Sequence, residues 1–326
     1  MKYGLFTYAE NKRFFNVGDN IQSLAAKQYL PQVDEYINRE KLADYKGDDI
    51  DIIMNGWFTH NTTNWVPSEP INPLFVSFHM NNTAAPNMLS EKGIAYLKKH
   101  EPIGCRDKFT AKTLQEKGID AYFSGCLTLT LDTYKVDDSE RTDDIYIVDP
   151  LYNYPRSEKV FYDLKRSVRS VLDGKAFQLG KKAKHLRNFI SDDLLESATF
   201  INQEPKANTY SDEEKFAMAE DLLQKYAKAK LVITSRIHCA LPCLAMGTPV
   251  IFINSFDSFV DSCRFDGILE LFNHITVDSK TGDFKANFDL PGKITKDTMV
   301  TNLGLHHKLA EPLKEKCKKF IARKNN

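Results

Sequence analysis

The sequence predicts an α/β fold in which two Rossmann-like domains face a cleft. Short β-rich runs alternate with helical patterns along most of the chain, which is typical of βαβ units and a mostly parallel sheet. The chain has 326 residues, whereas a single hydrophobic core usually stops growing at roughly 250–300 residues. A polar, aperiodic stretch at residues 135–144 separates two runs of this alternation. We therefore predict one domain at residues 1–138 and a second at residues 139–326.

The sequence of the first half indicates strands or extended segments that alternate with helices. A turn is expected at Asn16–Asn20, and Pro31 and Gly118 follow two of the helices, as residues that end helices do. The expected strands and helices are Lys2–Thr7, the helix Ile21–Leu30, Ile50–Met54, Leu74–Phe78, the helix Asn87–His100, Pro102–Cys105, the helix Phe109–Lys117, and Ile119–Phe123.

The second half continues the same alternation. Ser211 is the expected N-cap of a long helix that runs to about Lys228. The other expected elements are the strand Ile145–Val148, the helix Val160–Leu172, the strands Ala198–Asn202 and Leu231–Thr234, the helix Ile237–Met246, the strand Val250–Ile253 and the helix Leu309–Ala322. The last of these is basic and amphipathic, and we expect it to be a solvated helix that closes the second domain.

Bulk composition excludes several classes of protein. Lys+Arg and Asp+Glu are both 44, so the formal net charge is zero, which argues against nucleic-acid binding through bulk charge. No run approaches the ~18–20 apolar residues of a membrane span. The first apolar run stops at Glu10 and lacks the pattern of a signal peptide. A cytoplasmic location is the expectation.

The strongest candidate site lies where the buried run Leu231–Thr234 passes directly into a helix. Thr234, Ser235, Arg236 and His238 follow one another at this junction. Helix N-termini attract anions, a guanidinium binds carboxylate or phosphate, and an imidazole transfers protons. Taken singly, these residues would be read as a helix cap, a surface ion pair and a packing residue. Because parallel sheets bind ligands at the carboxyl ends of their strands, we expect an anion site here.

Two further segments resemble this junction. Arg106 and Asp107 come between an extended segment and a helix, and Asp107 is also a plausible helix cap. A second arginine from the other domain would complete an anion clamp across the cleft. Gly18, Asp19 and Asn20 follow the first strand, where the glycine would let the backbone approach a ligand and Asp19 would orient a hydroxyl. The alternative for that segment is a capped helix start.

Weaker signals complete the list of candidates. Asn55 and Gly56 follow the second strand, and the next residue, Trp57, would either stack on a sugar or pack in the core. His79 follows an apolar run and could line the cleft. Cys239 and Cys243 stand beside His238, and two buried thiols are favoured over a metal site there. No dinucleotide fingerprint, Walker lysine or metal-ligand spacing occurs, so we predict no metal and no cofactor.

In combination, these segments resemble the polysaccharide pyruvyl transferase family. The resemblance rests on Gly18-Asp19-Asn20, on Gly104-Cys105-Arg106-Asp107, and on Thr234-Ser235-Arg236-Ile237-His238 with Gly247-Thr248-Pro249 after it. It covers the chain from about Val17 to Ile253. The family is similar in fold to two-domain glycosyltransferases of the GT-B type.

The resemblance implies a function. Members of the family move the enolpyruvyl unit of phosphoenolpyruvate onto a sugar of a surface polysaccharide, such as a capsule or exopolysaccharide, forming a pyruvate ketal and releasing phosphate. Arg106, Arg236 and His238 would bind the donor and catalyse transfer, while Asp19 would orient or deprotonate the acceptor. The first domain would be the acceptor side and the second the phosphoenolpyruvate side. A lipid-linked acceptor would bring peripheral contact with a membrane.

Two other functions are compatible with the same residues. A GT-B-like glycosyltransferase would bind the diphosphate of a sugar nucleotide in the same basic cleft. A non-catalytic relative would bind a glycan or an anion without turnover.

Overall fold

Two six-stranded sheets form the framework of the protein, confirming the predicted α/β fold. This computed structural model describes residues 2–8, 14–161, 163–173, 176–206, 210–256 and 262–323. The first sheet is parallel throughout, in the order β2-β1-β3-β4-β5-β6, and the second has the order β12-β11-β10-β9-β7-β8, with only β12 antiparallel to its neighbour. The strands are β1 (Lys2–Thr7), β2 (Glu35–Asn38), β3 (Ile50–Phe58), β4 (Ile71–Met80), β5 (Ile103–Cys105), β6 (Ala121–Phe123), β7 (Ile145–Val148), β8 (Thr199–Ile201), β9 (Leu231–Thr234), β10 (Val250–Asn254), β11 (Asn273–Val277) and β12 (Phe284–Ala286).

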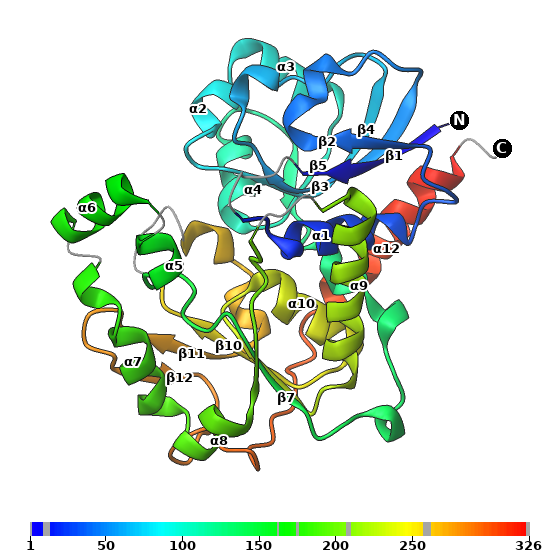
Figure 1. Cartoon of the computed structure of the whole chain (residues 1–326). Helices are drawn as coiled ribbons and strands as arrows, with labels where there is room; N and C mark the ends of the chain where they lie inside the picture. The colour runs from blue at the N-terminus through cyan, green and yellow to red at the C-terminus, as the bar shows by residue number, and fades with distance from the viewer. Residues whose placement is uncertain are drawn as a thin grey trace.

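Helices cover the sheets and fill the space between them (Figure 1). They are α1 (Val17–Lys27), α2 (Ala85–Met88), α3 (Glu91–Lys99), α4 (Lys108–Gln115), α5 (Ser157–Val160), α6 (Leu164–Leu172), α7 (Lys181–Phe189), α8 (Asp192–Ser197), α9 (Asp212–Lys228), α10 (Ile237–Met246) and α12 (His307–Ala322). In the described part of the chain, no helix is both long and apolar enough to cross a bilayer.

One hydrophobic core joins the two halves. It contains buried residues of β1 and α1 from the first half together with residues of α9, β9 and α10 from the second. Helix α1 packs against both α9 and α10. The N-termini of α1 and α10 are thereby held next to each other, since both helices belong to the same packed unit.

The C-terminal helix packs on the first half of the chain. Its buried face joins the shared core and contacts the 3₁₀ turn Leu127–Thr130 and strand β4. At its end, Arg323 Nη2 lies 3.0 Å from Asp51 Oδ1 on β3. This helix was expected to close the second domain, whereas it returns to the first.

The predicted division after Asp138 falls on the connection from Phe123 to Ile145, which joins the two sheets.

Two local predictions next to the candidate site were wrong. The turn expected at Asn16–Asn20 is the first turn of α1, because Asn16 caps the helix by accepting a hydrogen bond from the Gly18 N–H at 3.1 Å. Asn55 and Gly56 do not follow β3 but lie inside it. The register with β4 shifts between Met54 and Gly56, where Gly56 adopts a φ of +108°. This bulge, which glycine permits, lets the strand continue to Phe58.

Other differences concern element boundaries and short elements. Two expected helices are each divided in two, Asn87–His100 into α2 and α3, and Val160–Leu172 into α5 and α6. Some short strands and helices were not predicted, because they contain too few residues to show a clear period. They are β2, β11, β12, α7 and α8. Cys239 and Cys243 are buried free thiols, as favoured, and so are the other four cysteines.

Candidate active site

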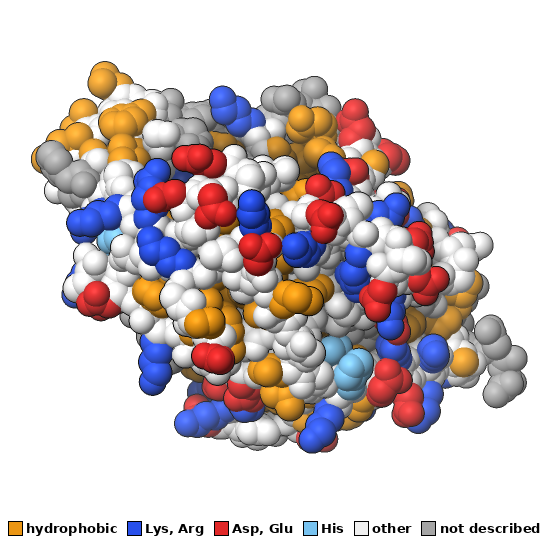
Figure 2. Space-filling model, turned by 90° about the horizontal axis from the view of Figure 1, so that it is seen from below, with side chains coloured by type: hydrophobic (Ala, Val, Ile, Leu, Met, Phe, Trp, Pro, Cys, Tyr) orange, Lys and Arg blue, Asp and Glu red, His pale blue; other side chains and the backbone are white. Residues whose placement is uncertain are grey.

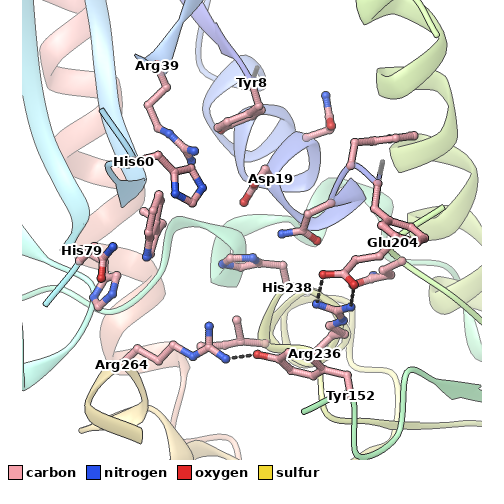
Figure 3. A pocket seen from close by; sticks show the side chains of 18 of the residues that line it. Tyr8, Asp19, Arg39, His60, His79, Tyr152, Glu204, Arg236, His238 and Arg264 are labelled. Carbon is pink, nitrogen blue, oxygen red and sulfur yellow. Dashed lines mark hydrogen bonds and ion pairs between the residues drawn. The ribbon is translucent and has the colours of Figure 1, made fainter. Parts of the chain in front are cut away.

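A cavity of about 880 Å³ opens between the carboxyl ends of the two sheets. Figure 3 shows that its polar side chains come from both halves and converge on His238. The first half supplies Asp19 from α1 and side chains near the ends of β2, β3, β4 and β5, and the second half those that follow β7, β8, β9 and β10. The charged and aromatic side chains that line the cavity are Tyr8, Phe14, Phe15, Asp19, Arg39, Glu40, Trp57, His60, His79, Arg106, Tyr152, Arg166, Glu204, Lys215, Arg236, His238, Arg264 and Phe265.

The structure brings part of the predicted set together in this cavity. Asp19, Asn20, Arg106, Arg236 and His238 all line it. They come from α1, from the segment after β5 and from the junction of β9 with α10, so they are far apart in sequence.

The remaining predicted residues lie behind the cavity wall. Thr234 Oγ1 donates to the Val148 carbonyl at 2.9 Å, and Ser235 Oγ donates to the Ile253 carbonyl at 2.8 Å. Both hydroxyls therefore connect β9 to neighbouring segments of the second sheet and hold the turn that carries Arg236 in place.

Gly18, Asn55 and Gly56 also act through their neighbours. A Cβ on Gly18 would lie 3.2 Å from the Cβ of His238, so the glycine lets α1 approach α10 closely. Asn55 Nδ2 donates to the carbonyl of Gln22 at 2.8 Å, and a Cβ on Gly56 would lie 3.1 Å from Gln22 Oε1. These residues position the start of α1, and with it Asp19.

Two arginines in the cavity are poorly neutralised by the residues that the structure describes. Arg106 is 2% exposed, and within the described residues its guanidinium donates no hydrogen bond; its Nε lies 4.0 Å from Asp107 Oδ2. Arg264 donates to the Tyr152 hydroxyl, lies over the rings of Phe256 and Phe265, and leaves its Nε without a partner. Burial, and then the charge of Arg106, lower the pKa of Arg264 to about 10. Two cations that lower each other's proton affinity in a largely desolvated cavity are unfavourable unless an anion binds near them.

Arg236, in contrast, is already paired. Its Nε donates to Asp149 Oδ2 at 2.8 Å, its Nη2 lies 3.3 Å from Glu204 Oε2, and its guanidinium stacks on Tyr152 with Cζ 4.0 Å from the ring centre. The interpretation of Arg236 as an open fork for a substrate anion therefore needs correction. Its charge is largely balanced within the protein, and its main role is to hold the wall of the cavity.

His238 lies at the first turn of α10 with its Nε2 buried and without a partner among the described residues. Burial, and then the charges of Arg106 and Arg236, lower its pKa well below the ordinary value. The imidazole is therefore neutral in the empty cavity. A bound anion would favour the protonated form, since it would offset the two guanidinium charges.

His79 and Asp107 form a second buried pair. His79 Nδ1 lies 2.6 Å from Asp107 Oδ2, and Asp107 also caps α4 by accepting from the Thr110 N–H at 2.8 Å. Burial raises the pKa of Asp107, but His79 and Arg106 outweigh this and hold it below its ordinary value. Burial, and then Arg106, lower the pKa of His79 to about 4. A neutral His79 that donates from Nδ1 to an ionised Asp107 keeps a lone pair on Nε2, as a general base requires.

Asp19 faces the cavity from the first turn of α1. Its Oδ1 accepts from Gln22 Nε2 at 3.1 Å. Burial raises the pKa of Asp19, and Arg39 and Arg106 oppose the rise. A carboxyl with a raised pKa exchanges protons nearer to neutral pH than an exposed one does.

Aromatic side chains line the cavity on the side of the first sheet. The guanidinium of Arg39 lies over Tyr8 and Trp57, at 4.8 Å and 5.0 Å from the ring centres, and is paired with Glu40 at 2.9 Å. Trp57 stands at the end of β3 beside His60, with 4.3 Å between the ring centres. Trp57 therefore contributes to the cavity rather than to the core, and offers a flat apolar face of the kind on which sugars stack.

Comparison with known proteins identifies the family of this chain. A family model described as polysaccharide pyruvyl transferase matches residues 16–258. The chain belongs to the polysaccharide pyruvyl transferase family. No curated protein matches the sequence. Among solved structures, a functionally uncharacterised protein from Klebsiella pneumoniae is similar at 13% identity and a TM-score of 0.41, over 82% of this chain and 88% of that one.

The segment matched to the pyruvyl transferase family contains all three motifs that carried the resemblance, but it ends before Arg264. Sequence reasoning missed this residue, together with Tyr8, Arg39, His60, Tyr152 and Glu204. Arg264 lies ten positions after the end of β10 with no flanking motif, and Tyr152 and Glu204 follow short strands without any distinctive pattern. Only their positions after strands could have drawn attention to them.

We expect the Arg236→Gln variant of this pyruvyl transferase to be less stable than the wild type by about 3 kcal/mol, because it leaves the buried Asp149 and the partly buried Glu204 with one cation fewer. Arg156, which also pairs with both carboxylates, keeps the loss near the lower end of the usual range. Urea unfolding measures the difference, with Arg187→Gln on the exposed part of α7 as the control. A loss of activity at unchanged stability would contradict this assignment.

The buried neutral His79 predicts a loss of stability in acid. Its pKa is about 4 in the folded protein and about 6.5 when unfolded, so the unfolded state binds more protons between these values. The contribution of His79 is fully present above about pH 6.5 and declines as the pH falls toward 4, by about 2 kcal/mol at pH 5. Urea midpoints at about pH 7 and pH 5 should differ less in His79→Gln than in the wild type. An equal difference would refute the prediction.

Proposed function

We propose that this member of the family transfers the enolpyruvyl unit of phosphoenolpyruvate to two hydroxyls of one sugar, forming a pyruvate ketal and releasing phosphate. The observation that carries the proposal is that the buried Arg106 and the partly buried Arg264, which line the same cavity as a neutral His238, are poorly neutralised by the described residues. Phosphoenolpyruvate carries its phosphate and its carboxylate on the same carbon atom, and two arginines and a helix N-terminus are suited to bind this pair of anionic groups.

The proposed donor site lies at the base of the cavity. Arg106 and Arg264 neutralise the phosphate and carboxylate, and the free N–H groups at the start of α10 add partial positive charge. Arg236 orients this site through Tyr152, which contacts both Arg236 and Arg264. The acceptor sugar would take the side lined by Trp57, Tyr8 and His60, which belongs to the first half, as expected from the resemblance.

The reaction requires two proton transfers that balance. The methylene carbon of the donor gains a proton while the first sugar oxygen bonds to the adjacent carbon and loses its own. The bond to phosphate then breaks, the second sugar oxygen takes its place, and the second hydroxyl proton leaves with the phosphate. His238 would carry the proton to the methylene carbon once the bound anion favours its protonated form. His79, held by Asp107, or Asp19 would accept a proton from the acceptor.

The test is phosphate release from phosphoenolpyruvate with a panel of nucleotide-linked and lipid-linked sugars. Calorimetry with phosphoenolpyruvate and with UDP separates pyruvyl transfer from glycosyl transfer. We expect phosphoenolpyruvate to bind, and phosphate to appear only with a competent acceptor. Binding of UDP without binding of phosphoenolpyruvate would overturn the proposal in favour of a sugar-nucleotide enzyme. Binding of phosphoenolpyruvate without phosphate release on any acceptor would favour a non-catalytic relative.

Because phosphoenolpyruvate is a cytoplasmic metabolite, the proposal places the reaction in the cytoplasm.

A further inference from the structure

Helix α6 exposes an apolar face for which the described residues provide no cover. None of its nine residues is buried, and Leu164 and Leu172 are 82% and 80% exposed. Val168 and Val171 lie between them and are about half exposed, as is Phe161 just before the helix. At 3.6 residues per turn, Leu164, Val168, Val171 and Leu172 fall within an arc of about 100°. Hydrophobic side chains gather at the left end of the molecule in Figure 2, the side on which α5 and α6 project in Figure 1.

Basic side chains flank this apolar arc. Lys165, Arg169 and Arg166 follow it around the helix, and the acidic residue Asp173, just past the C-terminus, lies 3.6 Å from Arg169. Residues 163–187, from the N-cap of α6 to the basic part of α7, contain eight Lys or Arg and two Asp, a net charge of +6 in a chain whose formal net charge is zero. This segment therefore carries an excess of positive charge.

The same helix reaches the active site. Arg166 lines the cavity that also contains His238 and Arg264. Arg166 lies on the side of α6 opposite the apolar arc, so a surface that covered the arc would lie about one helix diameter, roughly 10 Å, from the cavity wall.

We propose that α6 binds the surface of an anionic bilayer and brings the active site to a membrane-borne acceptor. The second part of this proposal rests on the proposed pyruvyl transfer; the first does not. A short helix with an apolar arc and adjacent lysines and arginines inserts into the boundary between head groups and acyl chains. Anionic head groups also supply the negative charge that this segment lacks. A second copy of the chain would instead bring another positively charged segment against the first.

The first test measures binding to vesicles without donor or acceptor, so it is independent of catalysis. The full-length chain should sediment with vesicles of equal parts phosphatidylglycerol and phosphatidylcholine, and remain in solution with phosphatidylcholine alone. Leu164→Ser with Leu172→Ser, and separately Lys165→Glu with Arg169→Glu, should each weaken binding by on the order of tenfold or more. Neither pair touches the residues proposed to bind substrate.

Matched variants elsewhere on the surface provide the controls. Met299→Ser with Leu305→Ser removes two other exposed apolar side chains, and Lys318→Glu with Lys319→Glu makes the same change of charge on α12. Both should bind vesicles as the wild type does. Equal losses in these controls, the absence of binding to the anionic vesicles, or a dimer in sedimentation velocity that the Leu164→Ser, Leu172→Ser variant abolishes would overturn the proposal.

A second measurement connects the membrane to turnover. With a soluble acceptor, the α6 variants should release phosphate at the wild-type rate, while with an acceptor in anionic vesicles they should be slower by on the order of tenfold. If no acceptor supports phosphate release but vesicle binding behaves as expected, the proposed reaction fails and the membrane surface stands. If phosphate release is equal on both acceptors and vesicle binding is absent, the proposed reaction stands and the proposed membrane surface fails.

Discussion

Replacing His238 with glutamine is expected to slow phosphate release by roughly 10²–10⁴-fold, the usual contribution of a positioned acid or base. Glutamine fills a similar space and still forms hydrogen bonds, but it carries no transferable proton near neutral pH. Because His238 Nε2 is buried without a partner among the described residues, the substitution removes no hydrogen bond that stabilises the fold. The loss should therefore appear in kcat, with phosphoenolpyruvate binding changed far less.

Calorimetry and single-turnover phosphate release separate these quantities. His185→Gln is the matched control, since His185 is buried among the second-half helices and bonded to the Tyr154 hydroxyl, outside the cavity. An undiminished kcat in His238→Gln would remove His238 from the chemistry and leave Asp19 and His79 as the groups able to move the proton.

Replacing Arg264 with glutamine is expected to lower kcat/KM for phosphoenolpyruvate by on the order of 10²–10³-fold, as the loss of a guanidinium that binds a reacting phosphate does. The same substitution should leave the free energy of unfolding unchanged or raise it. Among the described residues Arg264 has no carboxylate partner, and the desolvation that lowers its pKa makes its charge unfavourable there. Activity and stability should thus change in opposite directions.

Arginine variants at three positions separate residues that bind the donor from residues that stabilise the fold. Arg106→Gln should lower kcat/KM for phosphoenolpyruvate as Arg264→Gln does, whereas Arg236→Gln should lose stability because Asp149 stays buried and Glu204 partly buried with one cation fewer. In the wild type, phosphoenolpyruvate should raise the melting temperature, and this rise should shrink in Arg106→Gln and Arg264→Gln. If Arg264→Gln unfolds more easily than the wild type and binds the donor normally, Arg264 is a structural residue.

Much of the framework follows from local sequence pattern. The run Leu231–Thr234 is apolar throughout, as a strand buried on both faces must be, and Gly247 ends the following helix with a φ of +73°. Ser211 and Glu214 form the capping box that starts α9. These signals depend on a few adjacent residues, so they are present in the chain before it folds. The rule that ligands gather at the carboxyl ends of parallel strands then placed Arg106, Arg236 and His238 at the site.

The interpretation of each charged side chain depended on partners distant in sequence. Arg236 and Arg264 look equally suited to bind an anion, yet Arg236 meets Asp149 and Glu204, while among the described residues Arg264 meets aromatic rings and a hydroxyl. Asp107 is a helix cap in the sequence and becomes, in addition, the partner of His79 from the adjacent strand.

The strand-to-helix junction at Arg236 and His238 was therefore evident from the sequence alone, as were the parallel α/β sheets that position it. Tertiary structure decided which cations remain unpaired, which imidazoles are neutral, and that α6 leaves its apolar arc in solvent. The physical reason is that electrostatic balance and burial are sums over all neighbours in space. Local sequence specifies the strand and the helix, but the neighbours of a side chain exist only once the two sheets have packed around their common core.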